Sequence, residues 1–238
     1  MEKKDQVTAA LAFPPVMAFV MALRTWPWHF KFAFVCALLS FFTFCDGWYF
    51  VRLGLVHCSE RFDHWRKMPR KHLFAMSFLN GRVLPGDIDR NAHCNNARFL
   101  RECGFGRRDF WHRNGMWEII RANDCNLVVG AQSVRYRREL SLGHAYTLET
   151  RLMHWDDRAF YLEHRFVTTD YKTNQSFVHA IVLVKNSVIG KLSPSKLIEK
   201  LPDVGAYETK CPAMTRELQH WIDYNTASSK ILREEAQK

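Results

Sequence analysis

The segment GDIDRNAHCNNARFLRE at residues 86–102 carries the strongest local signal in this chain. Its first part is a polar loop that contains two carboxylates, a histidine and three asparagines. Asn95 or Asn96 is a favourable N-cap, which predicts a helix from about Asn96 to Asn114. The preceding residues 75–85 read as a strand that ends at Pro85-Gly86. A strand, a polar loop and a helix are therefore expected in this order.

The expected helix has one apolar side and two glycines, at positions 104 and 106, which would allow a sheet to approach closely. Residues predicted to share that side are Ala97, Leu100, Gly104, Arg107 and Trp111, with Cys103 and Phe110 close by.

Four strand-like runs follow the helix, at residues 126–140, 144–155, 160–170 and 177–190. The second run alternates, with Tyr146, Leu148 and Leu152 on one face. The tetrad at 156–159 predicts a tight hairpin, and the last run is apolar on both faces, as in a central strand. A short helix at 193–201 and an amphipathic helix at 214–236 complete the pattern. The fold class is therefore α+β, with one helix lying across an antiparallel sheet.

The loop also resembles the hot-dog thioesterases, in which a D-x-D-x-x-x-H-x-N-N-x-x-[YF] segment precedes the central helix. The matching residues are Asp87, Asp89, His93, Asn95, Asn96 and Phe99. Asn91 fits the D-x-N-x-H spacing of the plant acyl-carrier-protein thioesterases. The order of motifs over about residues 32–232 is most similar to the thioesterase superfamily member six branch, which is 4-hydroxybenzoyl-CoA thioesterase-like. The resemblance implies a hot-dog fold, an antiparallel sheet wrapped around a central helix, without a metal or cofactor. It also implies a homodimer with each site at the subunit interface.

Thioester hydrolysis needs a carboxylate that activates water or attacks the carbonyl, together with donors for the developing oxyanion. The resemblance assigns the carboxylate role to Asp89. Backbone N–H groups around residues 93–97 are expected to be unpaired and to supply the oxyanion donors. His93 would orient Asp89 or polarise the substrate, and Asn95 would hold the loop. Secondary candidates are Asn91, Asn96 and Glu102.

Capping and turn roles are the competing interpretation of Asp87, Asn95 and Asn96, and a structural role is the competing interpretation of His93. The sequence departs from the family pattern at Ala92, where many bacterial relatives have glycine. Cys94 also occupies a position that is usually β-branched.

The formal net charge is +10, which suggests an anionic partner. The charge is scattered, without a run of five basic residues, so nucleic acid is excluded as the expected partner. Arg135, Arg137 and Arg138 are weak candidates for binding the phosphates of coenzyme A, and a solvated strand face is the alternative. The 7 cysteines lack zinc-site spacing, so reduced and mostly buried thiols are expected.

Residues 32–51 form an apolar run long enough for one membrane-spanning helix. A cleaved signal peptide and a helix buried in a soluble core are the alternatives. A second apolar stretch, at 7–23, contains Pro14-Pro15 and has no assigned role. More Lys and Arg follow the run than precede it, which predicts a domain facing the cytosol from the endoplasmic reticulum membrane. With a cleaved signal the protein would instead be secreted.

The predicted organisation is an N-terminal segment at 1–52, a basic linker at 53–73, a hot-dog domain at 74–192 and a helical tail at 193–238. The predicted function is a membrane-anchored hydrolase of acyl-CoA or acyl-carrier-protein thioesters. The alternative is a catalytically silent acyl-lipid-binding or scaffolding protein with the same fold.

Overall fold

The computed structural model describes residues 24–44, 46–170, 172–202 and 210–237. The chain divides into two compact units, one ending at Met68 and one beginning at Pro69. The apolar stretch at 7–23 lies outside the described residues.

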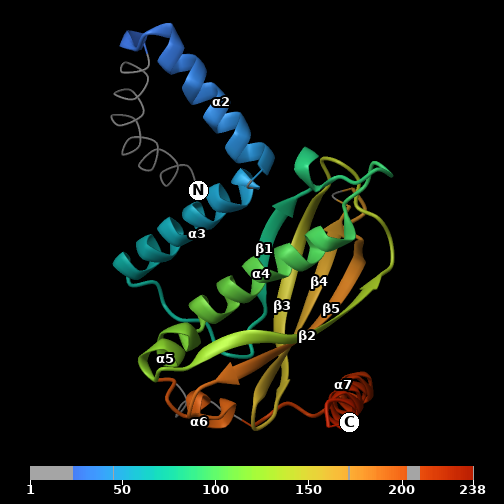
Figure 1. The fold of residues 1–238 in the computed structure, drawn as a ribbon. Coiled ribbons are helices and arrows are strands. Elements are labelled where there is room, and N and C mark those ends of the chain that lie inside the picture. Colours follow the sequence, from blue (N-terminus) through green and yellow to red (C-terminus); the bar gives the residue numbers. More distant parts are fainter. Residues whose placement is uncertain (1–23, 45, 171, 203–209, 238) are drawn as a thin grey trace. The chain divides into compact units, whose positions relative to one another are not determined.

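The N-terminal unit contains helices α2 (Trp28–Phe44) and α3 (Gly47–Trp65) (Figure 1). The single continuous helix predicted over residues 32–51 is wrong, because the chain bends by 86° between the two helices. Asp46 adopts a left-handed conformation with φ 42°, and a Cβ at Gly47 would lie 2.6 Å from the Phe41 ring. The first part of the predicted basic linker, up to Trp65, belongs to α3.

Among the described residues, no single helix has both the length and the apolar character needed to cross a membrane. The bent pair Trp28–Phe42 and Gly47–Trp65 meets the two criteria when its halves are counted together. The membrane anchor therefore stays a prediction.

The second unit is built on a five-stranded antiparallel sheet in the order β1-β3-β4-β5-β2. The strands are β1 (Ser77–Arg82), β2 (Asn126–Tyr136), β3 (Ala145–Trp155), β4 (Ala159–Thr169) and β5 (Ser176–Ile189). The predicted alternation in β3 is confirmed, with Tyr146, Leu148 and Leu152 buried. β5 lies between β4 and β2, as its apolar character predicted, and β4 at the centre is buried on both faces.

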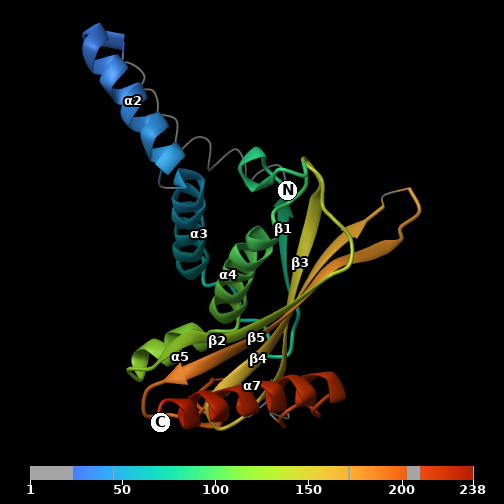
Figure 2. The same ribbon diagram turned by 45° about the vertical axis from the view of Figure 1, so that its right-hand side comes forward.

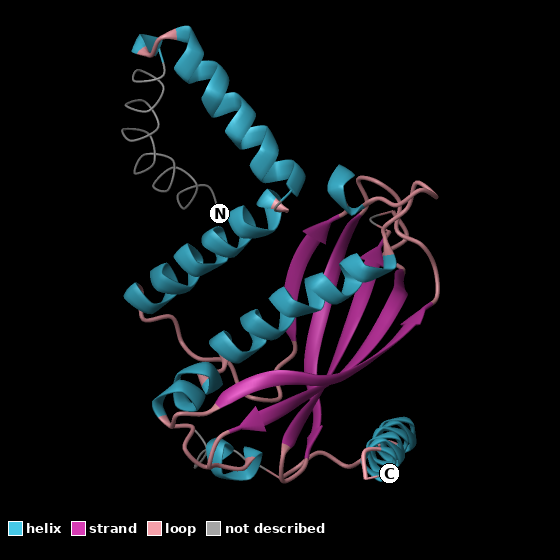
Figure 3. Cartoon of the chain, viewed as in Figure 1, coloured by secondary structure: helices cyan, strands magenta, loops and turns pink. Residues whose placement is uncertain are grey.

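Helix α4 (Asn96–Arg113) lies across one face of this sheet (Figure 3). Asn95 is its N-cap, because its side chain accepts a hydrogen bond from the Ala97 N–H at 2.9 Å. The predicted apolar side was partly wrong, since Ala97 is exposed and the buried side contains Phe99, Gly106 and Phe110. Gly106 is the glycine that permits close approach of the sheet, whereas a Cβ at Gly104 would find its nearest neighbour 3.9 Å away.

Helix α7 (Arg216–Glu235) covers the opposite face of the sheet (Figure 2). Its Leu218 is buried against Ala159 and Tyr161 of β4. The apolar face of this predicted amphipathic tail thus protects sheet residues that α4 does not reach.

Three short helices complete the unit: η1 (Pro85–Asp87), α5 (Met116–Ala122) and α6 (Pro194–Ile198). The sequence did not predict α5, which begins after Gly115 at φ 75° and buries Met116 and Ile120. The helix wrapped by an antiparallel sheet confirms the predicted hot-dog fold in the α+β class.

The described cysteines are all free, but the expectation that most are buried is wrong. Cys103 and Cys125 are buried, whereas the others are exposed or half-buried: Cys36, Cys58, Cys94 and Cys211. The two exposed thiols belong to α2 and α3, whose apolar surfaces are themselves exposed.

Candidate active site

Asp89 lies at the base of a tight loop between η1 and α4. Its N–H donates to the His93 carbonyl at 3.0 Å, and the Ala92 N–H donates back to the Asp89 carbonyl at 3.0 Å. Ala92 completes the turn with φ 62°. The loop therefore brings the side chains of Asp89 and His93 to one place.

His93 lies between two carboxylates. Its Nδ1 is 3.6 Å from Asp89 Oδ1, and its Nε2 is 3.7 Å from Glu139 Oε2. Asp89 Oδ1 also accepts a hydrogen bond from the Asn91 N–H at 2.9 Å. The Asp89 side chain is 21% exposed and that of Glu139 is 62% exposed. Sequence reasoning missed Glu139, which follows β2 and has no motif of its own.

The three asparagines of the loop differ in their contacts. Asn95 caps α4, as predicted, whereas the side chains of Asn91 and Asn96 are exposed. Asn91 holds Asp89 through its backbone N–H rather than through its amide.

The expectation of unpaired N–H groups throughout residues 93–97 is only partly correct. Cys94 donates to Leu140 O at 2.8 Å, Asn95 donates to Asp87 O at 2.8 Å, and Ala97 donates to the cap. Within this segment of the described chain, the N–H groups of His93 and Asn96 have no hydrogen-bond partner. Asn96, in the first turn of α4, is therefore the remaining helix-terminal donor.

A pocket of about 270 Å³ lies beside His93. It is lined by residues from the loop, the start of α4 and the end of β2: His93, Asn96, Phe99, Tyr136, Arg137 and Arg138, together with Cys94 and Glu139. The Tyr136 hydroxyl donates to the Asn96 carbonyl at 2.9 Å, which ties the end of β2 to the first turn of α4. Of the predicted site residues, His93, Asn96, Arg137 and Arg138 thus line one pocket, whereas Asp89, Asn91, Asn95, Glu102 and Arg135 do not.

The arginines differ in their placement. Arg138 Cζ lies 4.0 Å from the centre of the Phe177 ring, and that of Arg137 lies 5.1 Å from it. Arg137 also donates to the Val178 carbonyl at 3.1 Å. Arg135 is exposed on β2 and does not line the pocket.

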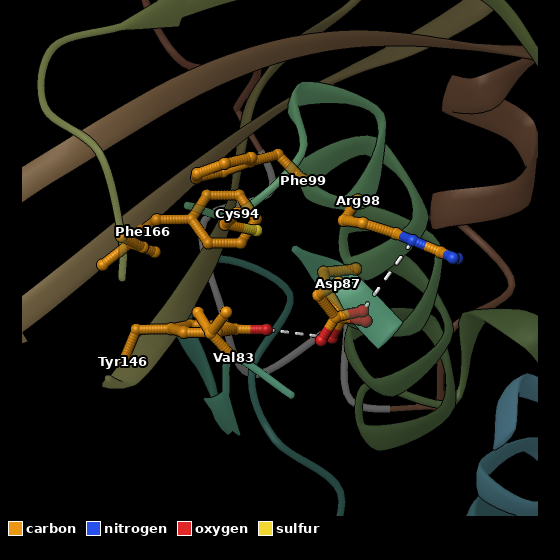
Figure 4. Close-up of a pocket in the computed structure, with 9 residues that line it drawn as sticks. Val83, Asp87, Cys94, Arg98, Phe99, Tyr146 and Phe166 are labelled. Carbon is orange, nitrogen blue, oxygen red and sulfur yellow. Dashed lines mark hydrogen bonds and ion pairs between the residues drawn. The ribbon is translucent and has the colours of Figure 1, made fainter. Parts of the chain in front are cut away.

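Asp87 and Glu102 are buried carboxylates in an ion-pair network, and Figure 4 shows Asp87 beside Arg98, whose Nε lies 3.8 Å from Asp87 Oδ1. Arg101 donates to Asp87 Oδ1 at 2.6 Å and to Glu102 Oε1 at 3.1 Å. The Tyr146 hydroxyl donates to Glu102 Oε2 at 3.1 Å. Both carboxylates line a second cavity of only about 10 Å³. Glu102 thus lies in a packed network and not in the pocket beside His93.

Cys94 contacts both cavities but is not a thiolate. Burial, reinforced by the negative charges of Asp87 and Glu102, raises the pKa of its thiol to about 12. The titratable groups left at the larger pocket are therefore His93 and Glu139, which line it, and Asp89, which contacts His93.

Comparison with known proteins identifies the family. A family model described as the thioesterase-like superfamily matches residues 83–231. Protein THEM6 of Danio rerio is 39% identical over 203 residues, covering 84% of this chain and 93% of that protein. The chain belongs to the THEM6 family. THEM6 of Drosophila melanogaster is 31% identical over 205 residues, covering 85% of this chain and 99% of that protein.

Solved thioesterases are similar to this THEM6-family chain at low identity. The 4-hydroxybenzoyl CoA thioesterase of Pseudomonas sp. strain CBS-3 is 13% identical, with a TM-score of 0.46, covering 52% of this chain and 97% of that chain. The segment matched to the thioesterase-like superfamily begins before the loop and ends within α7. The resemblance to this family, drawn from the order of motifs over about residues 32–232, is thus confirmed.

Proposed function

We propose that this THEM6-family chain hydrolyses acyl thioesters at the pocket beside His93. The observation that supports the proposal best is that His93, Asn96, Arg137 and Arg138 line one cavity, while Asp89 lies behind His93 with its Oδ1 3.6 Å from the His93 Nδ1. Carboxylate, imidazole, oxyanion donor and phosphate-binding cations are the groups that acyl-CoA hydrolysis requires.

In the proposed reaction, Asp89 accepts a proton from a water molecule while the water oxygen attacks the thioester carbonyl. The carbonyl oxygen gains negative charge, which the Asn96 N–H and the positive end of the α4 dipole stabilise. The C–S bond then breaks, and the thiol leaves with a proton that His93 transfers. The products are a carboxylic acid and a free thiol. Direct attack by Asp89, followed by hydrolysis of the mixed anhydride, is the covalent variant of the same chemistry.

His93 is proposed to position Asp89 and to carry the proton that Asp89 accepts to the leaving thiolate. Its imidazole lies between the partly shielded Asp89 and the exposed Glu139. Glu139, beside the second ring nitrogen, is proposed to orient the imidazole for this transfer.

Coenzyme A or an acyl carrier protein is the proposed carrier of the acyl group. Arg137 and Arg138 are anchored on Phe177 at the pocket, where their guanidinium groups suit a phosphate. The Phe99 ring packs 5.4 Å from Tyr136 and offers an apolar wall for the acyl chain.

A two-fold homodimer is proposed to complete the site. β2 is an edge strand of the sheet, and Val128 and Val129 on it are 40% and 44% exposed. An exposed, apolar edge strand favours pairing with a second copy.

Membrane association through α2 is also proposed, with the domain facing the cytosol from the endoplasmic reticulum membrane. The exposed apolar side chains of α2, including Phe32, Leu39 and Phe44, support it. Protection of the carboxy terminus from protease in intact microsomes would contradict the orientation, and recovery of a soluble, cleaved protein from the medium would favour secretion.

A catalytically silent acyl-lipid-binding protein is the second candidate. The observation in its favour is that three of the five N–H groups at residues 93–97 are occupied by the chain itself.

Chromatographic measurement of CoA released by the detergent-solubilised full chain decides between the two candidates. Asp89→Asn is expected to lower kcat about 10²–10⁴-fold, the usual contribution of a general base. Arg138→Ala is expected to raise KM, whereas Arg135→Ala, on the same strand but outside the pocket, serves as its matched control. Binding of acyl-CoA without release of CoA in all four proteins would establish the silent function.

A further inference from the structure

Helix α3 carries a continuous row of exposed apolar side chains. The row consists of six residues spaced three and four positions apart, which we name the α3 stripe: Trp48, Val51, Leu55, Cys58, Phe62 and Trp65. Their exposure reaches 64% at Leu55 and 77% at Trp65. The opposite side of the helix differs, because Leu53 and Val56 there are half-buried. Within the described part of the N-terminal unit, the stripe is thus an exposed apolar surface.

The charges around the stripe are arranged asymmetrically. At about 100° per residue, Arg52 and Arg61 flank the stripe on its two sides, Asp63 lies within about 20° of Arg52, and Glu60 lies opposite the stripe. Arg66 caps the helix, with its Cζ 5.6 Å from the centre of the Phe62 ring. An apolar row of Trp, Phe and Leu bordered by arginines is typical of helices that lie in the interface of an anionic membrane.

The bend before α3 adds an independent geometric argument. α2 and α3 meet at 86°, so a bilayer normal that follows the apolar α2 leaves α3 in the plane of the membrane. We propose that α3 is an in-plane membrane helix, whose stripe lies at the headgroup level of a bilayer that contains anionic phospholipid. The proposal refines the proposed membrane association and does not depend on hydrolysis at Asp89.

A second copy of α3 is a poorer occupant of the stripe. Two-stranded coiled coils favour Ile, Val and Leu at the seam and pair opposite charges beside it. Here both ends of the seam are tryptophans, and the flanking Arg52 and Arg61 have the same sign. Both features suit lipid headgroups better than another α3.

Fluorescence quenching in proteoliposomes tests the proposal with the full chain. The vesicles contain phosphatidylcholine and phosphatidylserine, with bromine on the acyl chains either near the headgroup or near the bilayer centre. If α3 lies in the plane, Trp48→Phe and Trp65→Phe remove similar amounts of quenching by the shallow label. In a continuous span the two rings would differ in depth by about 26 Å, at about 1.5 Å per residue. Trp117→Phe, in α5, is the matched control and should leave quenching unchanged.

Lipid composition provides the second readout. Replacing phosphatidylserine by phosphatidylcholine is expected to reduce the quenching of Trp65, because Arg61 and Arg66 lose their anionic partners. An unchanged value would overturn the preference for anionic lipid.

Three results would overturn the in-plane arrangement. If the deep label quenches Trp48 but neither label quenches Trp65, α2 and α3 cross the bilayer as a continuous span. Quenching of neither residue would show that the stripe does not contact lipid. Cross-linking of Cys58 to Cys58 of a second copy, with both tryptophans unquenched, would make the stripe a contact between chains. None of these results alters Asp89-dependent turnover, which is measured on the same vesicles.

Discussion

Two glycines in α4 should respond in opposite directions to the same substitution. An ideal Cβ at Gly106 would lie 2.8 Å from Leu148 Cδ2, 2.9 Å from Thr150 Oγ1 and 3.3 Å from His164 Nδ1. All three neighbours are buried, so they cannot move aside without disturbing the core. A Cβ at Gly104 meets nothing closer than the end of the Arg107 side chain at 3.9 Å.

The magnitudes follow from these contacts. Overpacking a core costs about 1–3 kcal/mol, and the close contacts at Gly106 place Gly106→Ala toward the upper end of that range. The higher helix propensity of alanine offsets about 1 kcal/mol, which leaves a net loss of about 1–2 kcal/mol. Gly104→Ala gains the propensity without the overlap, so it should stabilise the protein by up to about 1 kcal/mol.

Thermal unfolding of the full chain in one detergent, followed by near-ultraviolet circular dichroism, measures both changes. At about 2–4 °C per kcal/mol for a chain of this size, Tm should fall by about 2–8 °C in Gly106→Ala and rise by about 2–4 °C in Gly104→Ala. Equal increases in the two variants would refute the close approach of α4 to β3 and β4 at Gly106.

Three further predictions concern buried charges and thiols. Arg101→Met removes the cation that lies 2.6 Å from the buried Asp87 and 3.1 Å from Glu102, and leaves Arg98 at 3.8 Å from Asp87. The free energy of unfolding should fall by about 3–5 kcal/mol in denaturant titration, and a loss below about 1 kcal/mol would show that the network is not desolvated. Burial lowers the pKa of the His164 imidazole to about 3 in the folded state. Between about pH 6.5 and pH 3 the imidazole is therefore protonated in the unfolded state and neutral in the folded state, so the free energy of unfolding decreases as the pH falls through that window. His164→Gln should remove up to about 1.4 kcal/mol of this loss per pH unit in stability measurements from pH 6.5 to 5, and an unchanged slope would contradict the assignment. Burial and neighbouring carboxylates raise the pKa of Cys94 to about 12, so its thiol should resist a maleimide in the native protein at pH 7. The exposed Cys58 should react in detergent, and mass spectrometry of the labelled peptides distinguishes the two thiols.

Local signals predicted most of the second unit. Helix α4 was predicted to end one residue beyond its observed end, because Asn95 is a strong cap and the apolar spacing continues to Trp111. The hairpin of β3 and β4 was predicted correctly because alternation and the turn at Asp156 agree. Agreement between propensity, pattern and turn chemistry explains this success.

Features that depend on tertiary contacts were not predictable in the same way. Helix α5 is only seven residues long, so its periodicity provides too few repeats to recognise. The helix break at Asp46 was not predicted, because a hydropathy profile does not detect a residue with left-handed backbone inside an apolar run. Glu139 joins the site through the sheet edge and the loop, a pairing between His93 and Ser141 that no local pattern encodes.

The left-handed backbone at Ala92 limits how the loop can change over evolutionary time. A side chain in this conformation costs about 1–2 kcal/mol, which glycine would avoid. Glycine in turn loses about 0.4–1 kcal/mol through the greater freedom of the unfolded chain. The difference favours glycine by up to about 1.6 kcal/mol, so alanine is tolerated at a modest cost, while β-branched residues are disfavoured more strongly. Position 92 can therefore drift between two small residues without moving the carboxylate that the turn presents.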